Sequence, residues 1–137
     1  MVGRGLEAPP DFANVRTQET YVGRERASGR AVLSKGWNLE GERVVSSQAN
    51  ARIAIRFHAR DLHLVMGPAG APVRFRVLLD GKPPGADRGD DVDEDGYGTA
   101  SKRVLHQLIR QKGAITDRRF DIEFLDAGGE VYSFSFG

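Results

Sequence analysis

The residues best suited to bind a cation lie in an acidic segment past the middle of the chain. Five aspartates and a glycine in this segment are Asp87, Asp90, Asp91, Asp93, Asp95 and Gly96. Residues 91–96 have the spacing D-x-D-x-D-G, which opens an EF-hand loop because oxygens at alternate positions can wrap a hard cation. The position at which an EF-hand carries its bidentate glutamate is Lys102, so the sequence excludes an EF-hand.

Two interpretations of the acidic segment stay open. In the first, Asp91, Asp93 and Asp95 hold Ca²⁺ in a loop of a nonstandard kind. In the second, the carboxylates form a solvated acidic turn, which the lack of obvious flanking helices favours. We therefore expect no cofactor, with calcium as the exception to be tested.

The histidines His58, His63 and His106 do not form a metal-binding pattern. The first two flank a predicted hairpin turn, but a metal site needs further convergent ligands. We expect these two to be surface residues. Nor does the sequence contain a G-x-S-x-G segment or a pair of carboxylates that can be placed together in space. A hydrolase built on a β-sandwich is therefore the weakest interpretation, and we expect this chain to be noncatalytic.

Aromatic residues near polar turns suggest a different chemistry. A sugar ring has an apolar face that an aromatic side chain can cover, and hydroxyl groups that charged side chains can bind. Tyr21, Trp37 and Tyr97, together with Asp91 or Arg60, would supply both kinds of contact. The alternative for Trp37 is a place in the core, which is the commoner one for tryptophan.

These side chains need a scaffold, and the sequence predicts a sheet. Apolar and polar residues alternate in residues 53–58, 62–66 and 73–79, three runs separated by turns. Such alternation predicts antiparallel strands with one buried and one solvated face, so a second apolar layer must cover the buried face.

Further strands are predicted on both sides of this central part. Short apolar runs at residues 20–22 and 31–33 are candidates, and residues 37–45 predict a strand with a kink at Gly41. Residues 99–110 fit either a strand or a helix, and the context favours a strand. Residues 119–125 and 131–136 alternate again. In the second run Val131, Ser133 and Ser135 are predicted on one face and the three aromatic residues on the other.

The connections complete this picture. Residues 126–129 carry a hairpin signal. Residues 82–98 form a long aperiodic loop, a kind of loop that is often functional. Eight or nine short strands at regular spacing predict an all-β antiparallel β-sandwich or jelly roll.

Composition limits the remaining classes. The chain has 137 residues, enough for one domain, which we expect over residues 15–137 after a linker-like tail at residues 1–14. The net charge of +1 argues against nucleic-acid binding. There is no cysteine, and no apolar stretch long enough to insert into a membrane.

Several motifs together resemble those of a known family. Residues 17–27, TQETYVGRERA, resemble its T-P-E-T-Y-L-G-x-x-R-A entry, and residues 57–66 resemble its F-x-A-R-x-V-x-L-V-M strand pair. Residues 79–87, the acidic segment and the ending FSFG at residues 134–137 also fit. The set resembles the C-terminal module of bacterial thiol–disulfide interchange proteins of the DipZ type, which contain a thioredoxin-like domain and are associated with cytochrome c biogenesis.

The resemblance implies a jelly-roll sandwich similar to carbohydrate-binding modules, located in the periplasm or elsewhere outside the cytoplasm as part of a larger protein. A glycan or glycoprotein, and the thioredoxin-like domain of the parent chain, are the implied partners. The alternative is a structural or protein-interaction domain that docks on that domain or its substrate proteins. Gln18, Arg88 and His106 depart from the family pattern. If Arg88 and His106 line its pocket, His106 joins the ligand-binding candidates and ligand preference differs here.

Overall fold

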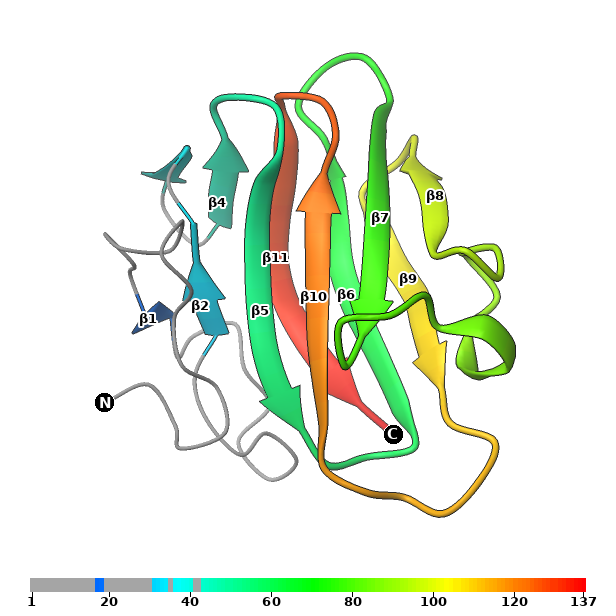
Figure 1. Cartoon of the computed structure of the whole chain (residues 1–137). Coiled ribbons are helices and arrows are strands. Elements are labelled where there is room, and N and C mark those ends of the chain that lie inside the picture. Colours follow the sequence, from blue (N-terminus) through cyan, green and yellow to red (C-terminus); the bar gives the residue numbers. More distant parts are fainter. Residues whose placement is uncertain (1–16, 19–30, 35, 41–42) are drawn as a thin grey trace.

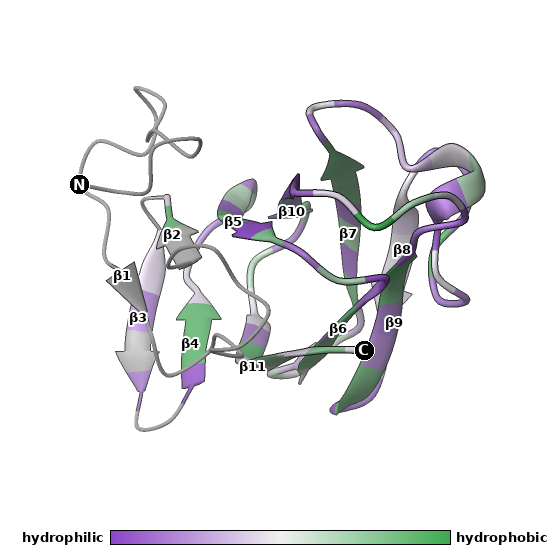
Figure 2. Cartoon of the chain, turned by 90° about the horizontal axis from the view of Figure 1, so that it is seen from below, coloured by the Kyte–Doolittle hydropathy of each residue, from purple (hydrophilic) through white to green (hydrophobic). Residues whose placement is uncertain are grey.

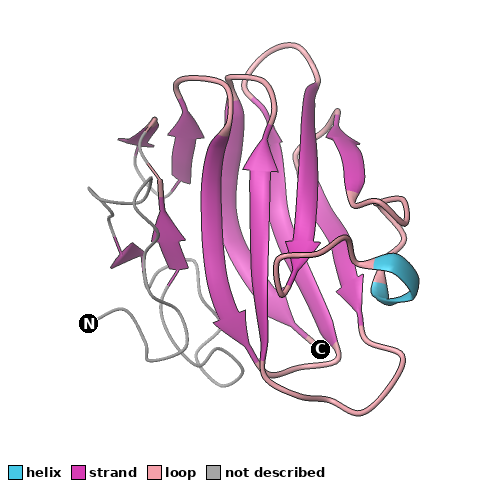
Figure 3. Ribbon diagram, viewed as in Figure 1, coloured by secondary structure: helices cyan, strands magenta, loops and turns pink. Residues whose placement is uncertain are grey.

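The segments with alternating apolar and polar residues form strands of two sheets in the computed structural model of this chain (Figure 1). The structure describes residues 17–18, 31–34, 36–40 and 43–137. The strands are β1 (Thr17–Gln18), β2 (Ala31–Leu33), β3 (Trp37–Glu40), β4 (Arg43–Ser46), β5 (Ala51–Phe57), β6 (Asp61–Pro68), β7 (Val73–Leu79), β8 (Tyr97–Ala100), β9 (Val104–Arg110), β10 (Arg118–Phe124) and β11 (Gly129–Phe136). A short 3-10 helix, η3 (Gly85–Asp87), lies between β7 and β8 (Figure 3). Within these ranges no helix is long and apolar enough to cross a bilayer.

The strands form two antiparallel sheets. One has the order β1-β2-β5-β10-β7-β8, and the other has the order β3-β4-β11-β6-β9. Figure 1 shows β5, β10 and β7 side by side in the first sheet, with β11 and β6 of the second sheet behind them. The predicted all-β antiparallel sandwich is confirmed, and residues 104–110 are a strand rather than a helix. The predicted tail, residues 1–14, lies outside the described residues.

The core lies between the two sheets and is aromatic. Phe57, Phe75, Phe120 and Phe124 are fully buried, and they meet Leu62, Leu64 and Met66 from the other sheet. The alternation predicted from the sequence produces this core, because every second residue of β5, β7 and β10 points inward. Figure 2 shows both hydrophobic and hydrophilic segments on β7, one of these strands. Burying each such phenylalanine stabilises the fold by roughly 1.5–3 kcal/mol.

The turns after β5 and β10 were expected to form hairpins, and this expectation is wrong. β5 lies in the six-stranded sheet, whereas β6 lies in the five-stranded sheet, and β10 and β11 are divided in the same way. Each turn therefore carries the chain from one sheet to the other. This arrangement lets the apolar faces of consecutive strands face each other across the core.

Two other expectations need correction. Residues 37–45 are not one kinked strand, because β3 and β4 are antiparallel partners with Glu40 opposite Arg43. In β11 the serines were expected to share a face with Val131, but Val131 is buried like Phe134. A bulge between Val131 and Ser133 inserts Tyr132 as an extra residue, which reverses the alternation.

Candidate binding pocket in the acidic loop

Backbone hydrogen bonds to the edge strand β9 position the first half of the acidic loop. Gly89 N–H donates to the Leu108 carbonyl at 2.9 Å, and Asp91 N–H donates to the Gln107 carbonyl at 3.0 Å. The Asp91 carboxylate accepts the Gln107 N–H at 2.6 Å. A side chain at Gly89 would place its Cβ 2.3 Å from the Gln107 carbonyl oxygen, so only glycine permits this close approach.

A tight turn builds the second half of the loop. The Asp93 carboxylate accepts the N–H groups of Asp95 and Tyr97 at 3.0 and 2.8 Å. Gly96 has φ +92°, and its N–H bonds back to the Asp93 carbonyl at 2.9 Å. Val92 is buried in the core cluster and anchors the loop to the core. Asp93 therefore fixes the turn by hydrogen bonds from its side chain to nearby backbone N–H groups, and Gly96 permits the positive φ that the turn requires.

The loop borders a shallow, open pocket of about 800 Å³, lined by Arg88, Asp90, Asp91, Val92, Asp93, Glu94, Asp95 and Tyr97. Tyr97 is 44% exposed. The Arg76 guanidinium lies 4.8 Å from its ring centroid and donates to the Asp95 carbonyl at 3.1 Å, which holds the ring in place. The Arg88 guanidinium donates to the Val92 carbonyl at 3.1 Å.

The carboxylates of the pocket divide into two groups. Those of Asp91 and Asp93 bond backbone N–H groups of the loop and of β9. Those of Asp90, Glu94 and Asp95 are exposed, and no described residue bonds or pairs with them. The second group is therefore available to a ligand. No group of three or more potential metal ligands occurs in the part of the chain that the structure describes.

The pocket brings together only part of the predicted binding set. Asp91 and Tyr97 line it, and so does Arg88, at which the sequence departs from the family pattern. Tyr21 lies outside the described residues. The sequence did not indicate Arg76, because its position against Tyr97 depends on the register between β7 and β8.

The other three candidates lie elsewhere. Trp37 packs on the core, with its ring edge against Phe124 at 5.6 Å and its indole N–H donating to the Arg52 carbonyl at 3.2 Å. Arg60 lies in the turn after β5 and pairs with Asp61 at 3.0 Å. His106 is buried, with Nδ1 2.9 Å from the Val104 carbonyl oxygen and its ring against Phe75.

Solved structures with the same fold define the class of the scaffold. A family two carbohydrate esterase from Clostridium thermocellum, solved with cellohexaose, has a TM-score of 0.58 at 10% identity. It is matched over 78% of this chain and 31% of its own. A family two carbohydrate esterase from Cellvibrio japonicus has a TM-score of 0.59 at 9% identity, over 88% and 32%. The chain is thus a jelly-roll-like β-sandwich that spans about a third of either esterase.

The family follows from the sequence comparison. The model described as the thioredoxin-like C-terminal domain matches residues 28–137. The chain belongs to this family. A comparison with curated proteins found no match.

Proposed function

We propose that this chain is a noncatalytic module that accompanies a thioredoxin-like domain in a larger protein and binds carbohydrate in the acidic-loop pocket. The observation that carries the proposal is the pairing of an exposed aromatic ring, Tyr97, with the unpartnered carboxylates of Asp90, Glu94 and Asp95 around one pocket. An aromatic face and a set of hydroxyl acceptors are the two contacts that a sugar ring requires.

The scaffold supports the same proposal. Its family is described as a thioredoxin-like C-terminal domain, and its fold is similar to part of two carbohydrate esterases. The parent protein would then be a thiol–disulfide interchange protein of the DipZ type, acting outside the cytoplasm, with this module positioning its redox domain on a glycan or glycoprotein. This chain has no cysteine and supplies no thiol to that chemistry.

The charge of the pocket predicts which sugars it prefers. Five carboxylates line it against the single guanidinium of Arg88. Repulsion between like charges disfavours uronic acids and sulfated sugars, whereas neutral sugars and amino sugars fit the pocket. Binding of amino sugars should weaken as salt is added, because the attraction acts between exposed charges.

The test is titration of the chain with neutral, amino and acidic oligosaccharides and with cell-wall fragments. We expect Tyr97→Ala to weaken binding about tenfold, since aromatic contacts of this kind contribute on the order of 1 kcal/mol or more. Tyr132→Phe, which keeps a ring on the other sheet, is the matched control and should bind as the unmodified chain does. Absence of binding at millimolar concentration would remove the proposal.

A further inference from the structure

The edge strand β9 has two halves that differ in how their outer side is covered. Along its whole length one side pairs with β6. On the other side, residues 88–91 cover the second half, with a bridge from Arg88 to Ile109 and the backbone bonds to Leu108 and Gln107 described above. The acidic loop therefore acts as a short added strand on this half of the edge.

The first half of the same edge is open. Gln107 directs both its N–H and its carbonyl away from β6, toward Asp91. Residues two apart in an antiparallel strand direct these groups to the same side, and the pairing with β6 is regular from Val104 to Gln107. The N–H and the carbonyl of Leu105 therefore also point outward, and no described residue bonds them.

Apolar side chains accompany these free backbone groups. Val104 and Leu105 are 47% and 45% exposed, and they are adjacent in sequence on the open half of β9. Natural edge strands usually carry charges or proline, or are very short, which prevents another chain from pairing with them. Two large apolar neighbours on an unpaired edge depart from this pattern. In Figure 2, β9 lies at the margin of the sandwich.

The residues at the start of the open half are basic. Lys102 and Arg103 are basic, residues 101–107 contain no acidic residue, and the acidic side chain that acts on Arg103 is Glu130 of β11. Tyr132 holds Arg103 in place, because its hydroxyl accepts from the guanidinium at 3.1 Å and the guanidinium lies 5.3 Å from the ring centroid. The segment that covers the other half, residues 88–91, contains Asp90 and Asp91 beside Arg88, so this edge already pairs with a segment that carries carboxylates.

We propose that the open half of β9, centred on Leu105, receives an extended acidic segment of another protein as an added strand. The backbone of the segment bonds Leu105. Because neighbouring side chains of a strand point to opposite faces, the apolar side chains of the segment contact Val104 on one face, and its carboxylates lie on the face of Leu105, toward Arg103. Strand addition of this kind obtains affinity from the main chain and specificity from alternate side chains. The proposal does not depend on sugar binding in the acidic loop.

The probe is a blocked octapeptide in which valine and glutamate alternate, added to the intact chain and followed by amide NMR. We expect shifts to concentrate at residues 102–106, and the exchange of the Leu105 amide proton to slow. The matched peptide with lysine in place of glutamate should bind at least tenfold more weakly. Equal binding of the two peptides would overturn the proposal, and so would shifts confined to other parts of the chain.

Backbone variants on both sides separate strand addition from simple charge attraction. Leu105→Pro removes the outward N–H and leaves the ladder to β6 intact, because proline is tolerated where an edge strand faces solvent. It should weaken binding more than Leu105→Ala, which keeps the N–H. A peptide N-methylated at alternate residues should also bind roughly tenfold more weakly, as expected for lost hydrogen bonds. This second comparison needs no variant to fold.

Two results would contradict the assigned occupant. If the N-methylated and unmodified peptides bind alike, the edge is not used for pairing. If the chain alone forms dimers that protect the Leu105 amide proton, and the peptide cannot displace them, a second copy of the chain occupies the edge instead.

Discussion

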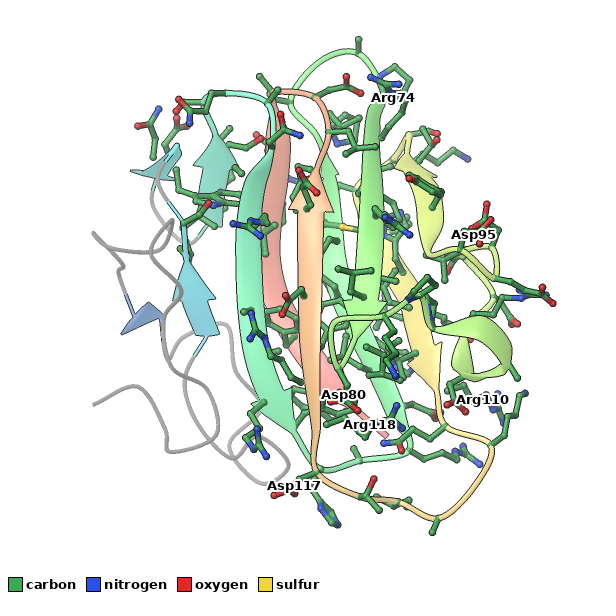
Figure 4. All side chains as sticks on the ribbon, in the orientation of Figure 1. Arg74, Asp80, Asp95, Arg110, Asp117 and Arg118 are labelled. Atoms are coloured by element: carbon green, nitrogen blue, oxygen red, sulfur yellow. The ribbon has the colours of Figure 1, made fainter. Side chains whose placement is uncertain are left out.

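The aspartate at the end of β7 and the aspartates of the acidic loop, in two regions of the molecule, use their carboxylates in different ways. At the end of β7, Asp80 accepts the Arg119 N–H at 2.8 Å and pairs with the Arg118 guanidinium, so its partners come from β10. In the acidic loop, the Asp93 carboxylate accepts the N–H groups of Asp95 and Tyr97, within four residues of itself. Figure 4 shows Asp80 and Arg118 together at the lower end of the sandwich, and Asp95 at its margin.

The first region stabilises the fold. Arg118 also donates to the Gln111 amide oxygen at 3.1 Å, and buried Gln111 donates to the Ala59 carbonyl at 2.8 Å. Burial alone would raise the pKa of Asp80, but the bonds from Arg119 and Arg118 outweigh it and lower that pKa. These contacts join segments that are distant in sequence, and their loss would separate strands.

The second region leaves carboxylates unused. Its internal bonds fix the shape of one turn, while Asp90, Glu94 and Asp95 extend into solvent. The comparison shows that the partner of an aspartate decides its role. A partner on a distant strand indicates a contribution to stability across the sheet, and a local partner fixes a turn, whereas a missing partner leaves the carboxylate free for binding.

The largest effect that tests this comparison should come from Arg118→Ala. The change removes the partner of Asp80 and Gln111, and we expect it to lower the free energy of unfolding by about 2 kcal/mol. Urea unfolding measures this. The matched control is Arg110→Ala, since Arg110 only approaches Asp61 at 4.0 Å and is half exposed. It should cost under about 0.5 kcal/mol. Equal losses in the two variants would contradict the assigned difference.

A smaller effect is expected for Asp93→Ala. Two backbone N–H groups lose their acceptor, which should cost about 1 kcal/mol and loosen the turn that holds Tyr97. Sugar binding should weaken together with stability. Asp95→Ala, the control, should weaken binding but leave the urea midpoint unchanged, because no described residue bonds its side chain. Loss of stability in the control would show that Asp95 is also structural.

A third test uses acid, at an exposed pair that resembles the first region in its partners. The hydrogen bond from Arg74 lowers the pKa of Asp126 to about 2, and the two side chains meet at 2.7 Å. Because the folded pKa lies below the ordinary value of 3.8, this pair stabilises the fold above that pH. Its contribution is lost as the pH falls through about 2. NMR titration should show this pKa, and Arg74→Gln should move it back toward 3.8. An unchanged value in the variant would assign the shift to another cause.

The smallest effect is expected for calcium. The sequence left a nonstandard site at Asp91, Asp93 and Asp95 open, but the first two carboxylates already bond N–H groups. We therefore predict that the Tm with calcium equals the Tm without it, within experimental error. Magnesium is the control and should also leave the Tm unchanged. A Tm that rises with calcium alone would place an ion in the loop and end its distinction from the first region.

The sequence was sufficient for the layers of the fold but not for their connections. Alternation marks which side of β5, β7 and β10 is buried, so the sandwich and much of the core were predictable. Whether the turn after Phe57 returns the chain to the same sheet depends on partners far along the chain. The same holds for the bulge at Tyr132, since nothing in residues 129–136 shows that two residues face one on β6.

The candidate site was predictable to a similar extent. Composition located the loop, and Asp91 and Tyr97 do line the pocket. Trp37 and His106 carry side chains that suit either a core or a pocket, and only the packing against Phe124 and Phe75 decides between the two. Arg76 approaches Tyr97 across two strands, a relation that periodicity does not reveal.

The order of strands has a consequence for how this protein is made. β10 is the middle partner of β5 and β7, and β11 is the middle partner of β4 and β6. Residues 118–136, which follow the other named strands along the chain, thus complete both layers. Until they emerge, the earlier strands expose apolar faces without neighbours. The two sheets must therefore wait for β10 and β11 before they can close, and a nascent chain stalled before β10 would need a chaperone to stay unaggregated.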